Sequence, residues 1–262
     1  MKDNLRRKGY LPLKEPYTDL VAFAGQDPCF IHVGKGGGET TTANVLSREG
    51  ADAIVDWVFL ELHDSEDPAK VVATRSALLQ RDGDIVDIDG VSPVEFDVIN
   101  GAYFIAIRHR NHLGTMTGVP IKFSENLVSF DFTDVDQLLY RLADPRKTSD
   151  HPTKNVNGVN CLWGGNSNGD RKVIFQGPGL DQDKLFFDIQ TDSTNINITD
   201  GHPNLNYIIN DYCIGDNNMD GELKYQGPDN DIDVLQFFNV ILHEENSRFL
   251  SNKIIYEQIP RE

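Results

Sequence analysis

Residues Gly215 to Asp233 read GDNNMDGELKYQGPDNDID, and the segment 50 residues earlier, Gly165 to Asp183, reads GNSNGDRKVIFQGPGLDQD. Over 24 aligned positions counted from Gly165 and Gly215, ten residues are identical without a gap. The identities combine oxygen-bearing side chains with a Gln-Gly-Pro turn, which chance does not preserve together. We interpret the pair as an internal duplication of one loop unit.

Both copies have the oxygen spacing of a calcium loop. Calcium takes about six to eight oxygen ligands, which a short loop supplies from side chains at positions 1, 3 and 5 and from a main-chain carbonyl at position 7. One carboxylate beyond the Gln-Gly-Pro turn is expected to return and complete the sphere. The predicted ligands of the second loop are Asp216, Asn218, Asp220, the carbonyl of Glu222, and Asp231 or Asp233. Those of the first loop are Asn166, Asn168, Asp170, the carbonyl of Lys172, and Asp181 or Asp183.

The two loops are not equal. The second loop has the turn residue Gly221 at position 6, where the first has Arg171, and the second also has one more carboxylate. A less permissive turn residue and less negative charge predict weaker calcium binding in the first loop. The alternative interpretation is two polar loops rich in Asp, Asn and Gly that need no metal.

The duplicated segment resembles the calcium-binding segment of dockerins. More closely, it is similar to C-terminal modules of very large secreted surface proteins of Bacteroidota, in which a β-rich domain precedes two such loops. The similarity extends upstream, so it covers nearly the whole chain, through the runs Gly37–Thr42, Ala53–Val58, Leu79–Asp84 and Arg108–Gly114. The chain departs from the family pattern at Asn166, where Asp is expected, and at Arg171, where Gly is expected. A dockerin would imply a cohesin partner.

Apolar patterning predicts a mainly β chain. Short strands rich in aromatic and β-branched residues, separated by turn signals, favour an antiparallel β-sandwich. The predicted strands are Ile54–His63, Val71–Leu79, Asp84–Ile88, Tyr103–Ile107 and Leu127–Phe132. Helical spacing and an Asp cap predict a helix at Asp134–Leu142. The apolar stretches that follow the loops, Lys184–Ile189 and Val234–Leu242, are expected to be helices, with Leu205–Ile209 and Lys253–Tyr256 as short partner helices, as in dockerins. We therefore expect a sandwich domain over residues 1–133, a connector over 134–160 and a small dockerin-like α domain with two calcium loops over 161–262.

Composition restricts the partners. The 24 Lys and Arg against 41 Asp and Glu give a formal charge of −17, which argues against nucleic acid or an anionic membrane as partner. No run of about 18 apolar residues predicts a membrane span. The N-terminal run from Met1 to Arg7 lacks an apolar signal core, and the resemblance places a similar run inside longer chains, so Met1 is not necessarily a start residue. A bridge between Cys161 and Cys213 is one option for the cysteines, and free buried thiols are the other.

No catalytic constellation is evident. His109 and His112 could bind a metal with a distant acid, but we interpret them as the polar tip of a hairpin. We expect a non-enzymatic, calcium-stabilised extracellular structural protein that attaches or self-assembles at the cell surface, as a filament or tube subunit or an adhesin module. Its partners would be copies of itself or another cell-surface protein. The alternative is a carbohydrate-binding or cohesin-type anchoring module of a larger secreted protein.

Overall fold

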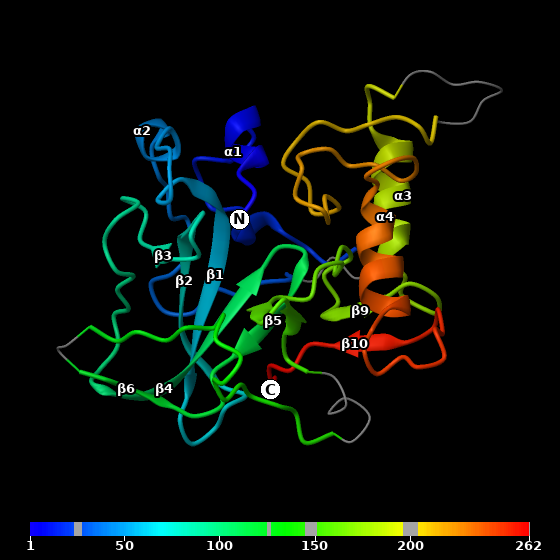
Figure 1. The fold of residues 1–262 in the computed structure, drawn as a ribbon. Helices are drawn as coiled ribbons and strands as arrows, with labels where there is room; N and C mark the ends of the chain where they lie inside the picture. The colour runs from blue at the N-terminus through cyan, green and yellow to red at the C-terminus, as the bar shows by residue number, and fades with distance from the viewer. Residues whose placement is uncertain (24–27, 125–126, 145–150, 196–203, 262) are drawn as a thin grey trace.

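The computed structural model describes residues 1–23, 28–124, 127–144, 151–195 and 204–261. Its main feature is one six-stranded antiparallel sheet in the order β3-β2-β1-β4-β5, with β6 paired to β4 (Figure 1). The strands of this sheet are β1 Ile54–Asp64, β2 Val71–Gln80, β3 Ile85–Val86, β4 Gly101–His109, β5 His112–Met116 and β6 Ile121–Phe123. The prediction of a mainly β, antiparallel chain is confirmed.

The central strand β1 is buried on both faces. Its Trp57 and Phe59 pack against an N-terminal layer that includes Leu5 and Tyr17. Its Val58, with Leu60, packs on the other side against chain segments outside the sheet. This N-terminal layer contains the short helices α1 Asn4–Lys8, η1 Tyr17–Asp19 and α2 Ala43–Leu46. Non-sheet segments thus cover both faces, and the described residues contain no second large sheet facing the first.

The C-terminal part is built around the two loops. Helix α3, Asp181–Thr191, lies beside α4, Asp231–Asp233, which continues into the π-helix η2, Val234–Ile241 (Figure 1). Strand β9, Lys172–Ile174, pairs with β10, Ile254–Tyr256, and a separate hairpin joins β7, Lys154–Val156, to β8, Val159–Cys161. The predicted helices at 184–189 and 234–242 are confirmed, apart from the last residue of the second.

Four predicted elements are wrong. Residues Asp134–Leu142 form turns and an isolated bridge from Leu139 to Thr117 instead of a helix, and part of the predicted connector, 145–150, lies outside the described residues. Residues Leu127–Phe132 are not a strand. The two expected partner helices do not form: a turn precedes the bridge from Ile209 to Leu223, and Ile254–Tyr256 is strand β10. For the three predicted helices, pairing with a neighbouring segment overrides local propensity.

The apolar core is continuous from the sheet into the C-terminal part. Leu113 on β5 packs with Trp163, Val173 and Leu235, and the last of these lies on η2. A further cluster joins α3 to the second loop through Leu185, Ile189, Leu223 and Ile232. The sheet therefore positions the loops directly.

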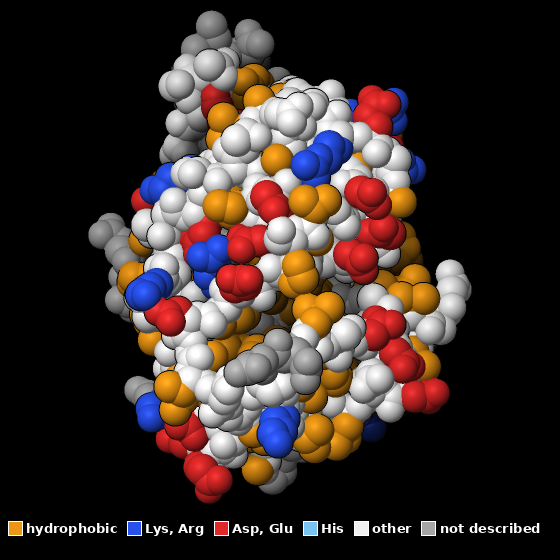
Figure 2. Space-filling view, turned by 90° about the vertical axis from the view of Figure 1, so that its left-hand side faces the viewer, with side chains coloured by type: hydrophobic (Ala, Val, Ile, Leu, Met, Phe, Trp, Pro, Cys, Tyr) orange, Lys and Arg blue, Asp and Glu red, His pale blue; other side chains and the backbone are white. Residues whose placement is uncertain are grey.

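Figure 2 shows one face on which acidic side chains appear in several separate places, with apolar side chains around a central hollow. No helix among the described residues has both the length and the apolar character needed to cross a membrane.

Candidate metal centre

The two duplicated segments share their backbone conformation. Four pairs of equivalent residues, 50 positions apart, have positive φ angles. They are Gly169 and Met219 at 75° and 60°, Arg171 and Gly221 at 66° and 80°, Gly177 and Gly227 at 138° and 95°, and Gly179 and Asp229 at 77° and 56°. The helices that follow also begin at equivalent residues, Asp181 and Asp231. Because non-glycine residues rarely adopt positive φ, these shared angles indicate one loop design used twice.

Side-chain oxygens hold the second loop in a closed turn. The carboxylate of Asp216 accepts hydrogen bonds from the N–H groups of Asp220 (3.0 Å) and Gly221 (2.8 Å). Asp220 accepts one from the N–H of Glu222 at 2.9 Å. The amide of Asn218 donates to the carbonyl of Asp229 at 2.8 Å, and its Oδ1 is buried without a hydrogen-bond partner among the described residues. Other buried side-chain oxygens also lack a partner among the described residues, such as Asn195 Oδ1, but Asn218 Oδ1 lies at a predicted ligand position and is available to a ligand there.

The returning carboxylate of the second loop is Asp231, not Asp233. Asp231 is fully buried, and its Oδ1 accepts the N–H groups of Asn217 (2.7 Å) and Asn218 (3.1 Å). Its Oδ2 accepts the N–H of Lys224 at 2.8 Å. Asp233 is exposed. The side chain that can complete a coordination sphere is therefore the one at the first position of the following helix.

The first loop repeats this arrangement. Asp181 is fully buried and accepts the N–H groups of Asn168 (3.3 Å) and Ile174 (2.7 Å), whereas Asp183 is exposed. Asp170 accepts the N–H of Lys172 at 2.9 Å. The structure thus brings one of the two alternative carboxylates to each loop and leaves the other on the surface.

Burial raises the pKa of the loop carboxylates. The pKa of Asp231 rises to about 8, because burial penalises its charge and the nearby charge of Asp216 adds to that effect. Burial also raises the pKa of Asp216, of Asp170 and, by more, of Asp181. Within the described part of the chain, Asp181, Asp216 and Asp231 form no ion pair. Asp181 and Asp231 therefore have no cationic partner among the described residues, whereas the charge of Arg110 acts on Asp216 without outweighing the effect of burial on its pKa.

A metal in either loop needs oxygens beyond the carboxylates. No group of three or more His, Cys, Asp or Glu side chains that could hold a metal ion is found among the residues described. The loops instead combine carboxylates with Asn oxygens and main-chain carbonyls. That donor set fits a hard cation with many oxygen ligands better than a transition metal held by a few strong side-chain ligands.

The first loop satisfies more of its own oxygens. Asn168 Oδ1 accepts the N–H of Asp170 at 2.9 Å, whereas the equivalent oxygen of Asn218 is without a partner. Asn166 Oδ1 accepts the N–H of Arg171 at 3.1 Å. The guanidinium of Arg171 extends out of the loop, where it pairs with Glu257 and donates to the carbonyl of Ile259 at 3.1 Å. The loop therefore depends partly on the C-terminal strand region for its shape.

The hairpin between β4 and β5 was expected to have a polar tip. The hairpin is confirmed, with His109 paired to His112, but its tip is buried against both loops. Arg110 is 1 % exposed and pairs with Asp56 at 2.6 Å. The fully buried Asn111 bonds to both loops. The sequence analysis missed these residues; the run of consecutive polar residues after an apolar strand was the available signal.

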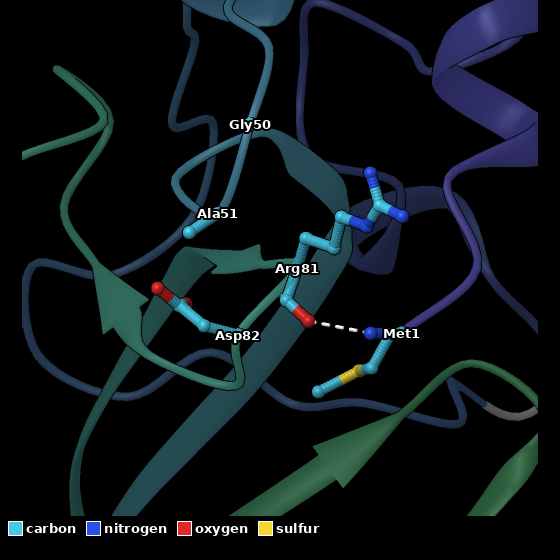
Figure 3. Close-up of a pocket in the computed structure, with 5 residues that line it drawn as sticks. All are labelled: Met1, Gly50, Ala51, Arg81 and Asp82. Atoms are coloured by element: carbon cyan, nitrogen blue, oxygen red, sulfur yellow. Dashed lines mark hydrogen bonds between the residues drawn. The ribbon is translucent and has the colours of Figure 1, made fainter.

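The remaining candidate sites are weak. A surface pocket is lined by Met1, Gly50, Ala51, Arg81 and Asp82, and in it the amino group of Met1 donates to the carbonyl of Arg81 at 2.5 Å (Figure 3). Figure 3 shows the side chains of Arg81 and Asp82 pointing to opposite sides, so they form no joint site. The cysteines are all free, and the bridge between Cys161 and Cys213 is not formed.

Comparison with protein-family models, with curated proteins and with solved structures finds no match to this chain.

Proposed function

We propose that the two loops bind calcium and that the bound ions stabilise the fold. The observation that carries this proposal is the pair of equivalent loops, each with a fully buried aspartate, Asp181 or Asp231, that has no basic partner among the described residues. Burying an uncompensated carboxylate is costly, so such groups are paired, protonated or bound to a cation. The oxygen-rich donor set and the unpartnered Oδ1 of Asn218 favour the cation.

In the second loop, Asp216, Asn218, Asp220 and Asp231 would hold the ion, with the carbonyl of Glu222. Their counterparts in the first loop are Asn166, Asn168, Asp170 and Asp181, with the carbonyl of Lys172. When bound, the cation supplies positive charge that neutralises the buried carboxylates. The residues of the chain do the rest: the N–H groups donated to Asp216 and Asp231 fix these carboxylates before an ion arrives.

The wider role that we propose is that of a non-catalytic structural module of an extracellular or cell-surface protein. The finer architecture, a β-sandwich followed by a dockerin-like domain, belongs to this proposal together with the suspected relation to Bacteroidota surface modules. Extracellular fluid is a calcium-rich medium, which suits loops that need the ion. A carbohydrate-binding role is less well supported, because Trp57 and Trp163 are both buried and neither can serve as a sugar platform.

Attachment to another surface protein or to copies of the same chain completes the proposal. Five apolar side chains on helix η2 and in the segment after it are about half exposed or more, and they support a contact surface there. They are Phe237, Phe238, Leu242, Phe249 and Leu250. Sedimentation of the chain with calcium, alone and with surface extracts, tests this part separately from ion binding.

Thermal unfolding in chelator, calcium and magnesium tests the proposed calcium binding. Calcium at about 1,000 times its dissociation constant adds about 4 kcal/mol per site. For a chain of this size, that corresponds to a rise in Tm of roughly 10 °C for each occupied site. Magnesium should have a much smaller effect, because it demands stricter geometry. Identical melting curves in chelator and calcium would contradict the proposal.

A further inference from the structure

Asn111 contacts the first predicted ligand position of both loops. Its side-chain Nδ2 donates to the carbonyl oxygen of Asp216 at 2.7 Å. Its own carbonyl oxygen accepts the N–H groups of Gly165 at 2.9 Å and Asn166 at 3.0 Å. Asp216 and Asn166 are equivalent residues, 50 positions apart. One fully buried residue of the β4–β5 hairpin thus holds the start of each loop.

A second bond connects the loops directly. The hydroxyl of Ser167 donates to Oδ1 of Asn217 at 3.0 Å, and these two residues are also equivalent. Ser167 is fully buried and Asn217 nearly so. The contact between equivalent positions brings the two loops together at one buried point, next to the predicted ligands on either side.

The hairpin tip itself is fixed to the sheet. Asn111 Oδ1 lies 2.8 Å from His112 Nδ1 and 3.1 Å from His109 Nδ1. Arg110 pairs with Asp56 on β1 and donates to the carbonyl of Cys213, just before the second loop, at 3.2 Å. The tip is therefore rigid, and Asn111 can pass the ordering of one loop to the other instead of losing it to local flexibility.

We infer that Asn111 is a positioning residue that couples the two cation sites, so that an ion in one loop increases the affinity of the other. This inference rests on the calcium binding proposed above. An ion that orders Asp216 also fixes its main-chain carbonyl, which accepts the side-chain amide of Asn111. Asn111 is thereby held in place. Its own main-chain carbonyl then holds Gly165 and Asn166 in position for the first site. A second ion binds to a loop that is already ordered and loses less conformational entropy.

The coupling is measured by removing one site and titrating the other. Calorimetric calcium titration of the whole chain is compared with that of Asp170→Ala, which disables the first loop, and of Asp220→Ala, which disables the second. Each substitution should lower the affinity of the intact loop about fivefold or more, and by the same factor in both directions because coupling is reciprocal.

The same pair of titrations in an Asn111→Ala background should show a coupling factor below about twofold. Asn160→Ala is the matched control, because Asn160 is also a buried asparagine that donates its amide to a main-chain carbonyl, that of Asp134 at 2.9 Å, away from the loops. Asn160→Ala should retain the full factor, which separates coupling from a general loss of stability.

Ser167→Ala provides a second test if Asn111→Ala does not fold, and it should reduce the coupling factor without removing either site. Two ions that bind independently to the unmodified chain would overturn the inference and leave the proposed calcium binding intact. A coupling factor that survives both Asn111→Ala and Ser167→Ala would also overturn it. A chain that binds no calcium in any titration would overturn the proposed function, and the coupling with it.

Discussion

Buried carboxylates have low pKa values in the sheet and raised pKa values in the loops. On β1, Asp56 pairs with Arg110 at 2.6 Å and Glu61 pairs with Arg108 at 3.0 Å, with all four side chains buried. Burial alone would raise the pKa of Asp56, but the charge of Arg110 and the interactions with His109 and Tyr212 together outweigh it and lower that pKa to about 2. The sheet thus neutralises its buried acids with its own cations.

In the loops, burial is not offset in this way. Asp231 has a pKa raised to about 8, and Asp216 beside it is raised as well. Both carboxylates accept main-chain N–H groups, which orient them but bring no full positive charge. The charge of Arg110 also acts on Asp216, but it does not outweigh the burial of that carboxylate. This difference from the sheet supports the proposal that the loop carboxylates bind a cation from solution.

The largest expected effect comes from breaking a pair in the sheet. Arg110→Met leaves Asp56 buried without its cation, which should lower the free energy of unfolding by about 3–5 kcal/mol. Denaturant unfolding should show this loss in chelator as well as in calcium. As a control, Lys14→Ala removes an exposed pair with Asp19 and should change stability by less than about 1 kcal/mol. A loss under 1 kcal/mol for Arg110→Met would contradict the importance of the pair.

The two regions should also respond to pH in separate windows. Because the folded pKa of Asp231 lies above its unfolded value, the folded state keeps a proton that the unfolded state has lost between about pH 4 and pH 8. In chelator, this contribution to stability is lost as pH rises towards 8, by up to about 1.4 kcal/mol per pH unit. Asp56 and Glu61 have folded pKa values of about 2, so their contribution is lost only as pH falls from about 4 towards 2.

Denaturant unfolding in chelator and in calcium between pH 5 and pH 8 measures this difference. Calcium should remove most of the decline, because the ion replaces the proton, so the gain from calcium should increase with pH. A gain that is constant over this range would contradict the assignment of Asp231 to the site.

A smaller effect should distinguish the two loops from each other. Asp220→Ala should remove the tighter calcium site and Asp170→Ala the weaker one, because the second loop has more carboxylates, the turn residue Gly221 and the unpartnered Oδ1 of Asn218. Calorimetry on both variants ranks the sites. Loss of the tighter site in Asp170→Ala would reverse the ranking.

The repeated loops could be predicted from the sequence because their signal is local. Oxygen-bearing residues at fixed spacing, with glycines at the turns, specify a backbone path whatever surrounds it, and the strands around Trp57 and Phe104 were equally clear from their apolar runs. The sequence alone does not decide between Asp231 and Asp233, since the choice depends on where the following helix begins.

Long-range features could not be predicted in this way. Residues 134–142 have helical spacing, yet Leu139 bridges Thr117, because a neighbouring segment offers it a partner. Asn111 lies in the run Arg108–Gly114 that carries part of the resemblance, but nothing in that run indicates its contact with the loops. Its role depends on the β4–β5 hairpin, which places it between the two loops. The first loop begins more than 50 residues further along the chain, and the second more than 100.

Asp216→Asn separates a role of Asp216 in cation binding from a purely structural one, because it gives the second loop the residue that the first already has at Asn166. Denaturant unfolding of this variant and of the unmodified chain, each in chelator and in calcium at pH 8, provides four free energies. In chelator the variant should equal or exceed the unmodified chain in stability, because a buried unpaired charge has been removed, and in calcium it should lose a large part of the gain from the ion. An equal loss of stability in both conditions would contradict the account, because Asp216 would then serve the fold as a hydrogen-bond acceptor only.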